Sequence, residues 1–69
     1  MELVECHSGS AYAERPLALV WEDQRLEIEA VLAAWREPGE RHFKVRTRGQ
    51  RIFLLVYREA DDVWQIKPM

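Results

Sequence analysis

The sequence has very little cysteine: Cys6 is the only one in 69 residues, so no disulfide can form within the chain. Small secreted domains commonly depend on disulfides, and a chain without them is typical of a reducing compartment. No apolar run approaches the roughly 18 residues needed to cross a bilayer. The N-terminus, MELVECHS, has an acid where a signal peptide needs a basic region. We therefore expect a cytoplasmic protein that does not associate with membranes.

The sequence also lacks the patterns that mark common catalytic and cofactor sites. No Gly-rich fingerprint precedes a helix, and no nucleophile and base can be placed on a common site. Cys6 and His7 are neighbours, but alternation along a strand points them in opposite directions, and a zinc site needs two close ligand pairs. Asp61 and Asp62 are typical of a turn rather than of a magnesium site. We predict a non-enzymatic protein with no catalytic residue, no metal site and no cofactor.

What the sequence does contain is enough apolar material for one small core. Hydrophobic residues make up 48% of the chain and include three Trp, two Tyr and two Phe, which is not the composition of a disordered tail. A chain of this length hides only about 60% of the surface that its unfolded form exposes. We therefore predict a single domain over residues 1–69 with marginal stability.

The hydrophobic period is mostly two, which indicates strands. Alternation and turn signals predict strands at residues 3–6, 16–22, 42–48, 51–58 and 63–67. The clearest turn is EPGE, residues 37–40, because proline presets φ and glycine accepts a positive φ. Residues 51–58 are apolar on both faces, as in a central strand that is covered from both sides.

Residues 26–36 fit two structures. Ile28, Val31, Leu32 and Trp35 have the spacing of an amphipathic helix, whereas the even-numbered residues 26–34 alternate as in a strand. No capping residue precedes Leu26, and a short charged turn links this segment to residues 16–22. We favour a long, bent strand, with a helix as the alternative.

Together these elements predict an all-β fold: a small, antiparallel, strongly curved sheet or SH3-like barrel of about six strands. The alternative is an α+β fold with a helix at 26–36. The predicted core consists of Leu19, Trp21, Ile28, Leu32, Phe43, Val45, Leu54, Val56, Trp64 and Ile66. The apolar residues left for the other face are Val20, Val31, Trp35, Phe53, Leu55 and Tyr57.

The segments PLALVWEDQRLEI, VLAAWREP, HFKVRT, FLLVY and VWQIK, within residues 16–67, carry a family resemblance. They resemble a family of small bacterial proteins of unknown function, with a proline-led strand that ends in Trp, a Trp-Arg pair and a terminal Trp strand. The resemblance implies a bacterial all-β domain and no catalytic residue. Some relatives are associated with genes for DNA-repair enzymes, which implies a role as a repair accessory.

The charge is distributed unevenly along the chain. Residues 1–35 have a net charge of −5 and residues 36–69 of +3, and the segment 41–51 carries five positive side chains and no acid. His42, Lys44, Arg46 and Arg48 fall on one face of a strand, at a spacing that roughly tracks successive phosphates. If EPGE closes a hairpin in which residue numbers sum to about 77, Arg48 faces Glu29 and Gln50 faces Glu27. Such cross-strand pairs explain part of this basic comb as an ordinary solvated face.

Two functions follow from these features. We rank first a non-enzymatic interaction module that binds a protein partner or a second copy through its apolar sheet face, with Val31 and Trp35 as contact residues. The alternative is binding of single-stranded nucleic acid, or of an acidic partner, through Lys44, Arg46, Arg48 and Arg51. In that alternative Tyr57 or Trp35 stacks on the bases.

Overall fold

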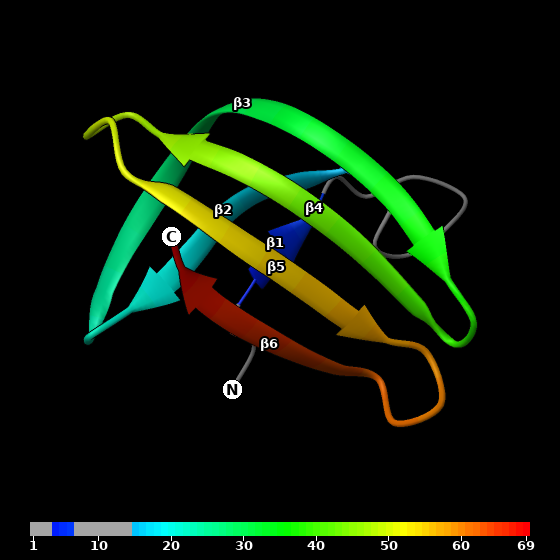
Figure 1. The fold of residues 1–69 in the computed structure, drawn as a ribbon. Helices are drawn as coiled ribbons and strands as arrows, with labels where there is room; N and C mark the ends of the chain where they lie inside the picture. Colours follow the sequence, from blue (N-terminus) through cyan, green and yellow to red (C-terminus); the bar gives the residue numbers. More distant parts are fainter. Residues whose placement is uncertain (1–3, 7–14) are drawn as a thin grey trace.

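The computed structural model describes residues 4–6 and 15–69, and within them all regular secondary structure is β-strand (Figure 1). The strands are β1 (Val4–Cys6), β2 (Pro16–Trp21), β3 (Gln24–Glu37), β4 (Glu40–Thr47), β5 (Ile52–Arg58) and β6 (Val63–Pro68). The predicted all-β fold is confirmed, and the helical alternative for residues 26–36 is wrong because that segment lies inside β3. No helix long and apolar enough to span a membrane occurs in the described part of the chain.

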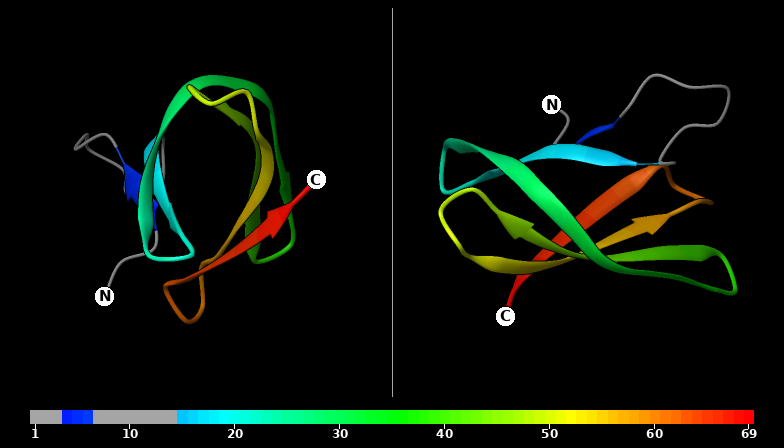
Figure 2. Two further views of the ribbon diagram at one scale, coloured as in Figure 1. Left: turned by 90° about the vertical axis from the view of Figure 1, so that its left-hand side faces the viewer. Right: turned by 90° about the horizontal axis from the view of Figure 1, so that it is seen from above.

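The strands form one antiparallel meander in which each strand pairs with the next along the chain, in the order β1 to β6. The sheet curls strongly, and β3 arches over the top to join its two walls (Figure 2). Its ends, β1 and β6, are not neighbours in the strand order, so the result is a half-barrel. The concave side holds the core.

Turn geometry explains where the hairpins lie. Glu22 and Asp23 both adopt a positive φ, 51° and 64°, as a two-residue hairpin turn with right-handed twist requires. Between β3 and β4, Gly39 has a φ of 76° and follows Pro38, so the predicted EPGE turn is confirmed. In the next turn Gln50, rather than Gly49, takes the positive φ, at 67°.

Two irregularities bend β3 and allow it to serve both walls. Its register with β4 shifts between Ile28 and Ala30 and again between Val31 and Ala33. A β-bulge adds a residue on one strand, which bends that strand and increases its twist. The curl of the sheet therefore has its local cause in the middle of β3.

The core lies between the two walls and is built around large side chains of β5. The buried cluster consists of Val4, Leu19, Phe43, Val45, Phe53, Leu55 and Trp64. Aromatic contacts connect it, with ring centroids 5.7 Å apart for Trp21 and Phe53 and 6.0 Å apart for Phe43 and Trp64. Thr47 is the buried polar residue among those described, and its Oγ1 accepts a hydrogen bond from the backbone N–H of Arg51.

Leu32 and Leu54 of the predicted core do not belong to it, and Val56 is buried but lies on the convex face, outside the core cluster. Leu32 is 43% exposed because it lies at the second bulge of β3, where alternation breaks. Leu54 is half-buried on the convex face, whereas its neighbours Phe53 and Leu55 are fully buried on the concave face. Since β5 is apolar on both faces, its pattern does not distinguish them; the pairing of Phe53 with Val45 does.

The short strand β1 places the cysteine against this core. Val4 is fully buried and Cys6 is half-buried and packs on the cluster, while Glu5 between them is exposed. Cys6 has the surroundings of a small hydrophobic residue. His7 and the loop after it lie outside the described residues.

Candidate functional site

Among the described residues, three of the six exposed large apolar side chains lie in the middle of β3. Val31 is 36%, Leu32 43% and Trp35 42% exposed, and the alanines at 33 and 34 are exposed as well. Residues 30–35, AVLAAW, contain no charged side chain. We call residues 30–35 the free β3 segment, because β2 does not pair with this part of β3.

On the side away from β4, most of β3 has no partner strand among residues 4–6 and 15–69. β2 pairs with β3 only from Gln24 to Glu27, whereas β4 pairs with it from Ile28 to Glu37. β2 begins at Pro16, which pairs with β1, so it does not extend along the rest of β3. The free β3 segment therefore presents a backbone edge together with exposed apolar side chains, a combination suited to pairing with another strand.

The predicted contact residues Val31 and Trp35 both belong to the free β3 segment. Their exposure fits the role predicted for them. Phe53 and Leu55, which the sequence left for the same apolar face, are fully buried in the core instead. Tyr57 is half-buried near Trp64, with ring centroids 5.0 Å apart.

The basic comb lies on the convex face of β4, and acidic side chains of β3 neutralise much of it. Arg46 Nε lies 3.0 Å from Glu29 Oε2, and Arg48 Nε lies 3.1 Å from Glu27 Oε1. Lys44 has no ion pair with a described residue and faces Ala33 across the ladder. Two of the cations in the comb are thus held in cross-strand pairs of the kind that an ordinary sheet surface contains.

These ion pairs show how the bulges change the predicted register. Near the turn, residue numbers of paired positions sum to 77, as predicted: Trp35 faces His42 and Ala33 faces Lys44. Beyond the two bulges the sum falls to 75, where Ile28 faces Thr47. Arg48 consequently meets Glu27 instead of Glu29.

The remaining residues proposed for nucleic-acid binding do not join the comb. The guanidinium carbon of Arg51 lies 4.9 Å from the ring centroid of the core residue Phe53. Tyr57 pairs with Arg41, which lies on the same face of β4 as the buried Phe43. The hydroxyl of Tyr57 donates a hydrogen bond to Asp62 Oδ1 at 2.7 Å. The structure therefore separates Tyr57 from Lys44 and Arg46 by the thickness of the sheet.

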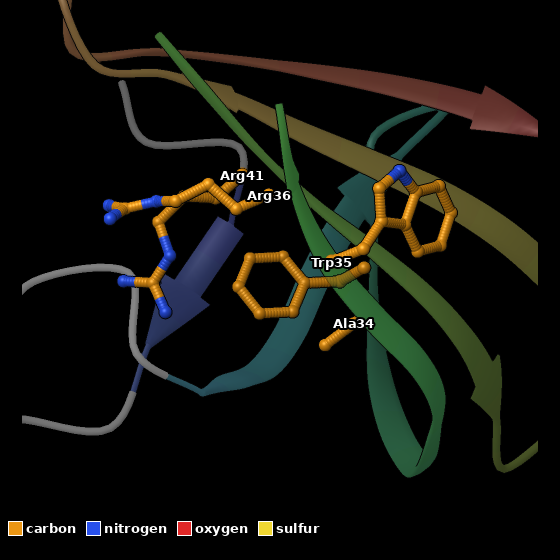
Figure 3. A pocket seen from close by; sticks show the side chains of 5 residues that line it. Ala34, Trp35, Arg36 and Arg41 are labelled. Carbon is orange, nitrogen blue, oxygen red and sulfur yellow. The ribbon is translucent and has the colours of Figure 1, made fainter. Parts of the chain in front are cut away.

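A hollow of 510 Å³ lies at the end of the β3–β4 hairpin. Ala34, Trp35, Arg36, Arg41 and Phe43 line it. Figure 3 shows Arg36 and Arg41 extending to the same side, with the indole of Trp35 on the other. Arg36 is ion-paired to Glu59 at 2.7 Å, and the guanidinium of Arg41 lies 5.6 Å from the ring centroid of Phe43. Protein groups thus already engage both arginines.

A cluster of three potential metal ligands lies on the convex face at the same hairpin. His42 Nε2 is 3.1 Å from Glu40 Oε1 and 3.6 Å from Glu37 Oε2. Sequence reasoning missed this group: it weighed Cys6, His7 and His42 for zinc and Asp61 and Asp62 for magnesium, and it did not combine His42 with Glu37 and Glu40. The signal was present, because the EPGE turn with its sum of 77 already places Glu37 opposite Glu40, and His42 follows two residues later on the same face.

The two aspartates of the last turn point to separate partners. Asp61 Oδ2 lies 3.3 Å from Arg58 Nη1, and Asp62 accepts the hydroxyl hydrogen of Tyr57. Asp62 also has a positive φ of 54°, which is typical of an Asp in a turn. Both contacts belong to turn structure.

No protein-family model, curated protein or solved structure matches the chain. The resemblance to a bacterial family of unknown function stays a prediction.

Proposed function

We propose that this protein is a non-enzymatic interaction module that self-associates through the free β3 segment. A second copy adds its own β3 alongside, in antiparallel orientation, so that one sheet continues into the other. The observation that carries this proposal is an uncharged, apolar strand edge that has no partner strand among residues 4–6 and 15–69. Such an edge is a template for another strand unless the protein protects it.

The other outer edges of the described sheet carry protection. β1 has three residues, one of them the charged Glu5. β6 carries Lys67 and ends at Pro68. Short length, lysine and proline are the usual means by which a sheet edge avoids pairing with another chain. The free β3 segment has none of them, so it is the edge that fits a partner strand.

A second copy fits this edge by symmetry. In a twofold antiparallel pair, one residue must meet its own copy on the axis. With Ala33 on the axis, residues 31–35 of the two copies lie opposite one another, and Ala30 lies opposite Arg36. With Leu32 on the axis, Glu29 would face Trp35. Both registers place the apolar residues 31–34 of one copy opposite apolar residues of the other.

Sedimentation velocity over a concentration series tests the proposal. We expect the protein to sediment as a dimer in the upper part of the series, and Val31→Lys or Leu32→Lys to sediment as a monomer throughout. A lysine on the edge introduces charge that the second copy carries at the same place. The matched control is Val63→Lys, because Val63 is 45% exposed and lies on β6. This control should still dimerise.

Two results would overturn self-association at β3. One is a wild-type protein that stays monomeric at millimolar concentration. The other is a dimer that Val63→Lys dissociates as readily as Val31→Lys does, which would place the interface on another edge. Circular dichroism of each variant shows whether the fold is retained.

The alternative, single-stranded nucleic-acid binding, is supported by Lys44, which makes no ion pair with a described residue and projects from the same face as Arg46 and Arg48. The ion pairs of Arg46 and Arg48 rank it second, because a phosphate would have to compete with Glu29 and Glu27. Fluorescence anisotropy with a labelled oligonucleotide at low salt separates the two functions. Binding that falls steeply with salt and disappears in Arg46→Glu would favour the alternative.

A further inference from the structure

We infer that Glu37, Glu40 and His42 form a binding site for a divalent transition-metal ion, with Zn²⁺ as the preferred class. The site lies on the convex face, at the tip of the β3–β4 hairpin. All three ligands come from the same hairpin of one chain, so the site does not require a second copy.

The spacing of the three ligands suits one ion. One ligand atom from each residue, the imidazole nitrogen and two carboxylate oxygens, lies within 4.8 Å of the other two. Ligand atoms bound to a tetrahedral zinc at about 2.0 to 2.2 Å lie about 3.3 to 3.5 Å apart. The distances from His42 Nε2 to the two carboxylates, 3.1 and 3.6 Å, bracket that value. Rotation of the Glu37 and Glu40 carboxylates would bring all three ligand atoms to this spacing.

The surrounding residues hold two of the ligands in place. The imidazole of His42 stacks on the indole of Trp35, with ring centroids 5.2 Å apart, and its side chain is only 12% exposed. The indole N–H of Trp35 donates to Glu37 Oε2 at 3.1 Å. Trp35 thus orients both the nitrogen ligand and one carboxylate, as outer contacts of metal sites commonly do.

The pairing of the strands adds an electrostatic reason for a cation. Glu37 and Glu40 are directly opposite each other in the ladder, next to the turn. Like charges at opposed positions destabilise a sheet. A bound cation would replace this repulsion with two attractive contacts. Binding the ion should therefore stabilise the hairpin.

The donor set selects the class of metal. One imidazole and two carboxylates match the mixed nitrogen and oxygen sites of zinc, where three protein ligands leave a fourth position for water. Mg²⁺ and Ca²⁺ prefer six or more oxygen ligands, which this cluster does not provide.

His42 Nδ1 is buried and makes no hydrogen bond with any described residue, although a metal-bound imidazole usually donates from its second nitrogen. We therefore expect micromolar rather than nanomolar affinity.

Isothermal titration calorimetry of the metal-free chain with ZnCl₂ tests the site. We expect one Zn²⁺ per chain, and binding at least about tenfold weaker in His42→Gln and in Glu40→Gln, which keep the size of each side chain. Titration with Co²⁺ should give the visible absorption of a four-coordinate site. MgCl₂ at the same concentrations should give no saturable signal.

Matched controls remove the other candidate ligands. Cys6→Ala and His7→Gln delete the remaining thiol and imidazole of the chain, and Asp61→Asn removes a carboxylate from another turn. Each of these should bind zinc as the wild type does. The inference is overturned if zinc does not saturate the protein at 1 mM, if His42→Gln and Glu40→Gln bind with unchanged affinity, or if Cys6→Ala or His7→Gln abolishes binding. Circular dichroism confirms that each variant is folded.

Discussion

Trp35 lies stacked on His42 across the β3–β4 ladder, with ring planes 17° apart. The two residues are direct cross-strand partners, and His42 in turn faces Val56 on β5. Val56 points to the convex face yet is only 3% exposed. The row of Trp35, His42 and Val56 therefore forms a small apolar cover on the side of the sheet that lies away from the core.

Replacing Trp35 by Ala should lower the free energy of unfolding by about 1 kcal/mol, the usual value of an aromatic pair beyond its buried area. The measurement is urea unfolding at low protein concentration, where self-association does not contribute. The ring protons of His42 should also lose the shift that the indole ring current causes. Trp35→Phe serves as the control and should retain most of both effects; equal stability of wild type and Trp35→Ala would contradict the stacking contact.

Phe53 and Leu54 allow a direct test of which face of β5 lies in the core. Phe53 is fully buried, so Phe53→Ala should cost about 3 to 5 kcal/mol, comparable with the entire stability of a domain this small. Leu54 is half-buried on the convex face, which no second layer of the described residues covers. Leu54→Ala should therefore lower the free energy of unfolding markedly less than Phe53→Ala does. Thermal unfolding followed by circular dichroism measures both. A larger loss for Leu54→Ala would mean that the concave face is assigned to the wrong residues.

Gly39 should be sensitive to substitution for conformational reasons alone. A Cβ at this position would meet no atom within 4 Å, yet φ is 76°. A left-handed conformation costs a residue with a Cβ about 1 to 2 kcal/mol. We therefore expect Gly39→Ala to destabilise the protein by about that amount in urea unfolding. Gly49→Ala, at a glycine without a positive φ, is the matched control and should have a smaller effect.

In the turn between β2 and β3, a substitution by glycine should stabilise the protein. Asp23 has a φ of 64° in a hairpin turn where glycine is the favoured residue. Asp23→Gly should raise the free energy of unfolding by up to about 1 kcal/mol, because removing the Cβ relieves the left-handed conformation. A decrease in stability would show that the Asp23 side chain contributes more than its backbone conformation costs.

The ion pair between Glu5 and Arg25 should make stability depend on pH. Two hydrogen bonds from the Arg25 guanidinium, at 2.7 and 3.0 Å, lower the pKa of Glu5 below its ordinary value of 4.5. The unfolded state then binds the proton more readily than the folded state does. The contribution is therefore fully present above the ordinary pKa and is lost as the pH falls through the lower, folded-state value.

Urea unfolding at several pH values between 7 and 3 measures this effect. Glu5→Gln should flatten the decline in stability at the acid end of the series, because the neutral amide does not titrate. The control Glu22→Gln removes an exposed carboxylate in the nearby turn, and it should leave the slope unchanged. Parallel curves for the wild type and Glu5→Gln would exclude a role for the ion pair.

Much of the fold could be read from short-range patterns. Alternation in residues 42–48 predicted the buried side of β4, where Phe43, Val45 and Thr47 lie. The proline and glycine of EPGE predicted the hairpin and its register near the turn. These features depend on the period of two in a strand and on the φ preferences of single residues, both of which are local properties.

The surface of β3 depended on bulges that no local pattern predicted. The bulges of β3 shifted the register so that Arg48 meets Glu27, and they brought Leu32 to the surface. The hairpin cluster, by contrast, lies where the register follows the EPGE turn, which places Glu37 opposite Glu40 and Trp35 opposite His42.

The sequence by itself determined that the chain is a meander of short strands with a hairpin at EPGE, because alternation and turn chemistry act between near neighbours. Only the tertiary structure decided which face of β5 is buried and which edge of β3 is left without a partner among the described residues. Both depend on how far the sheet curls, and that curvature is the sum of bulges and twist along the whole sheet.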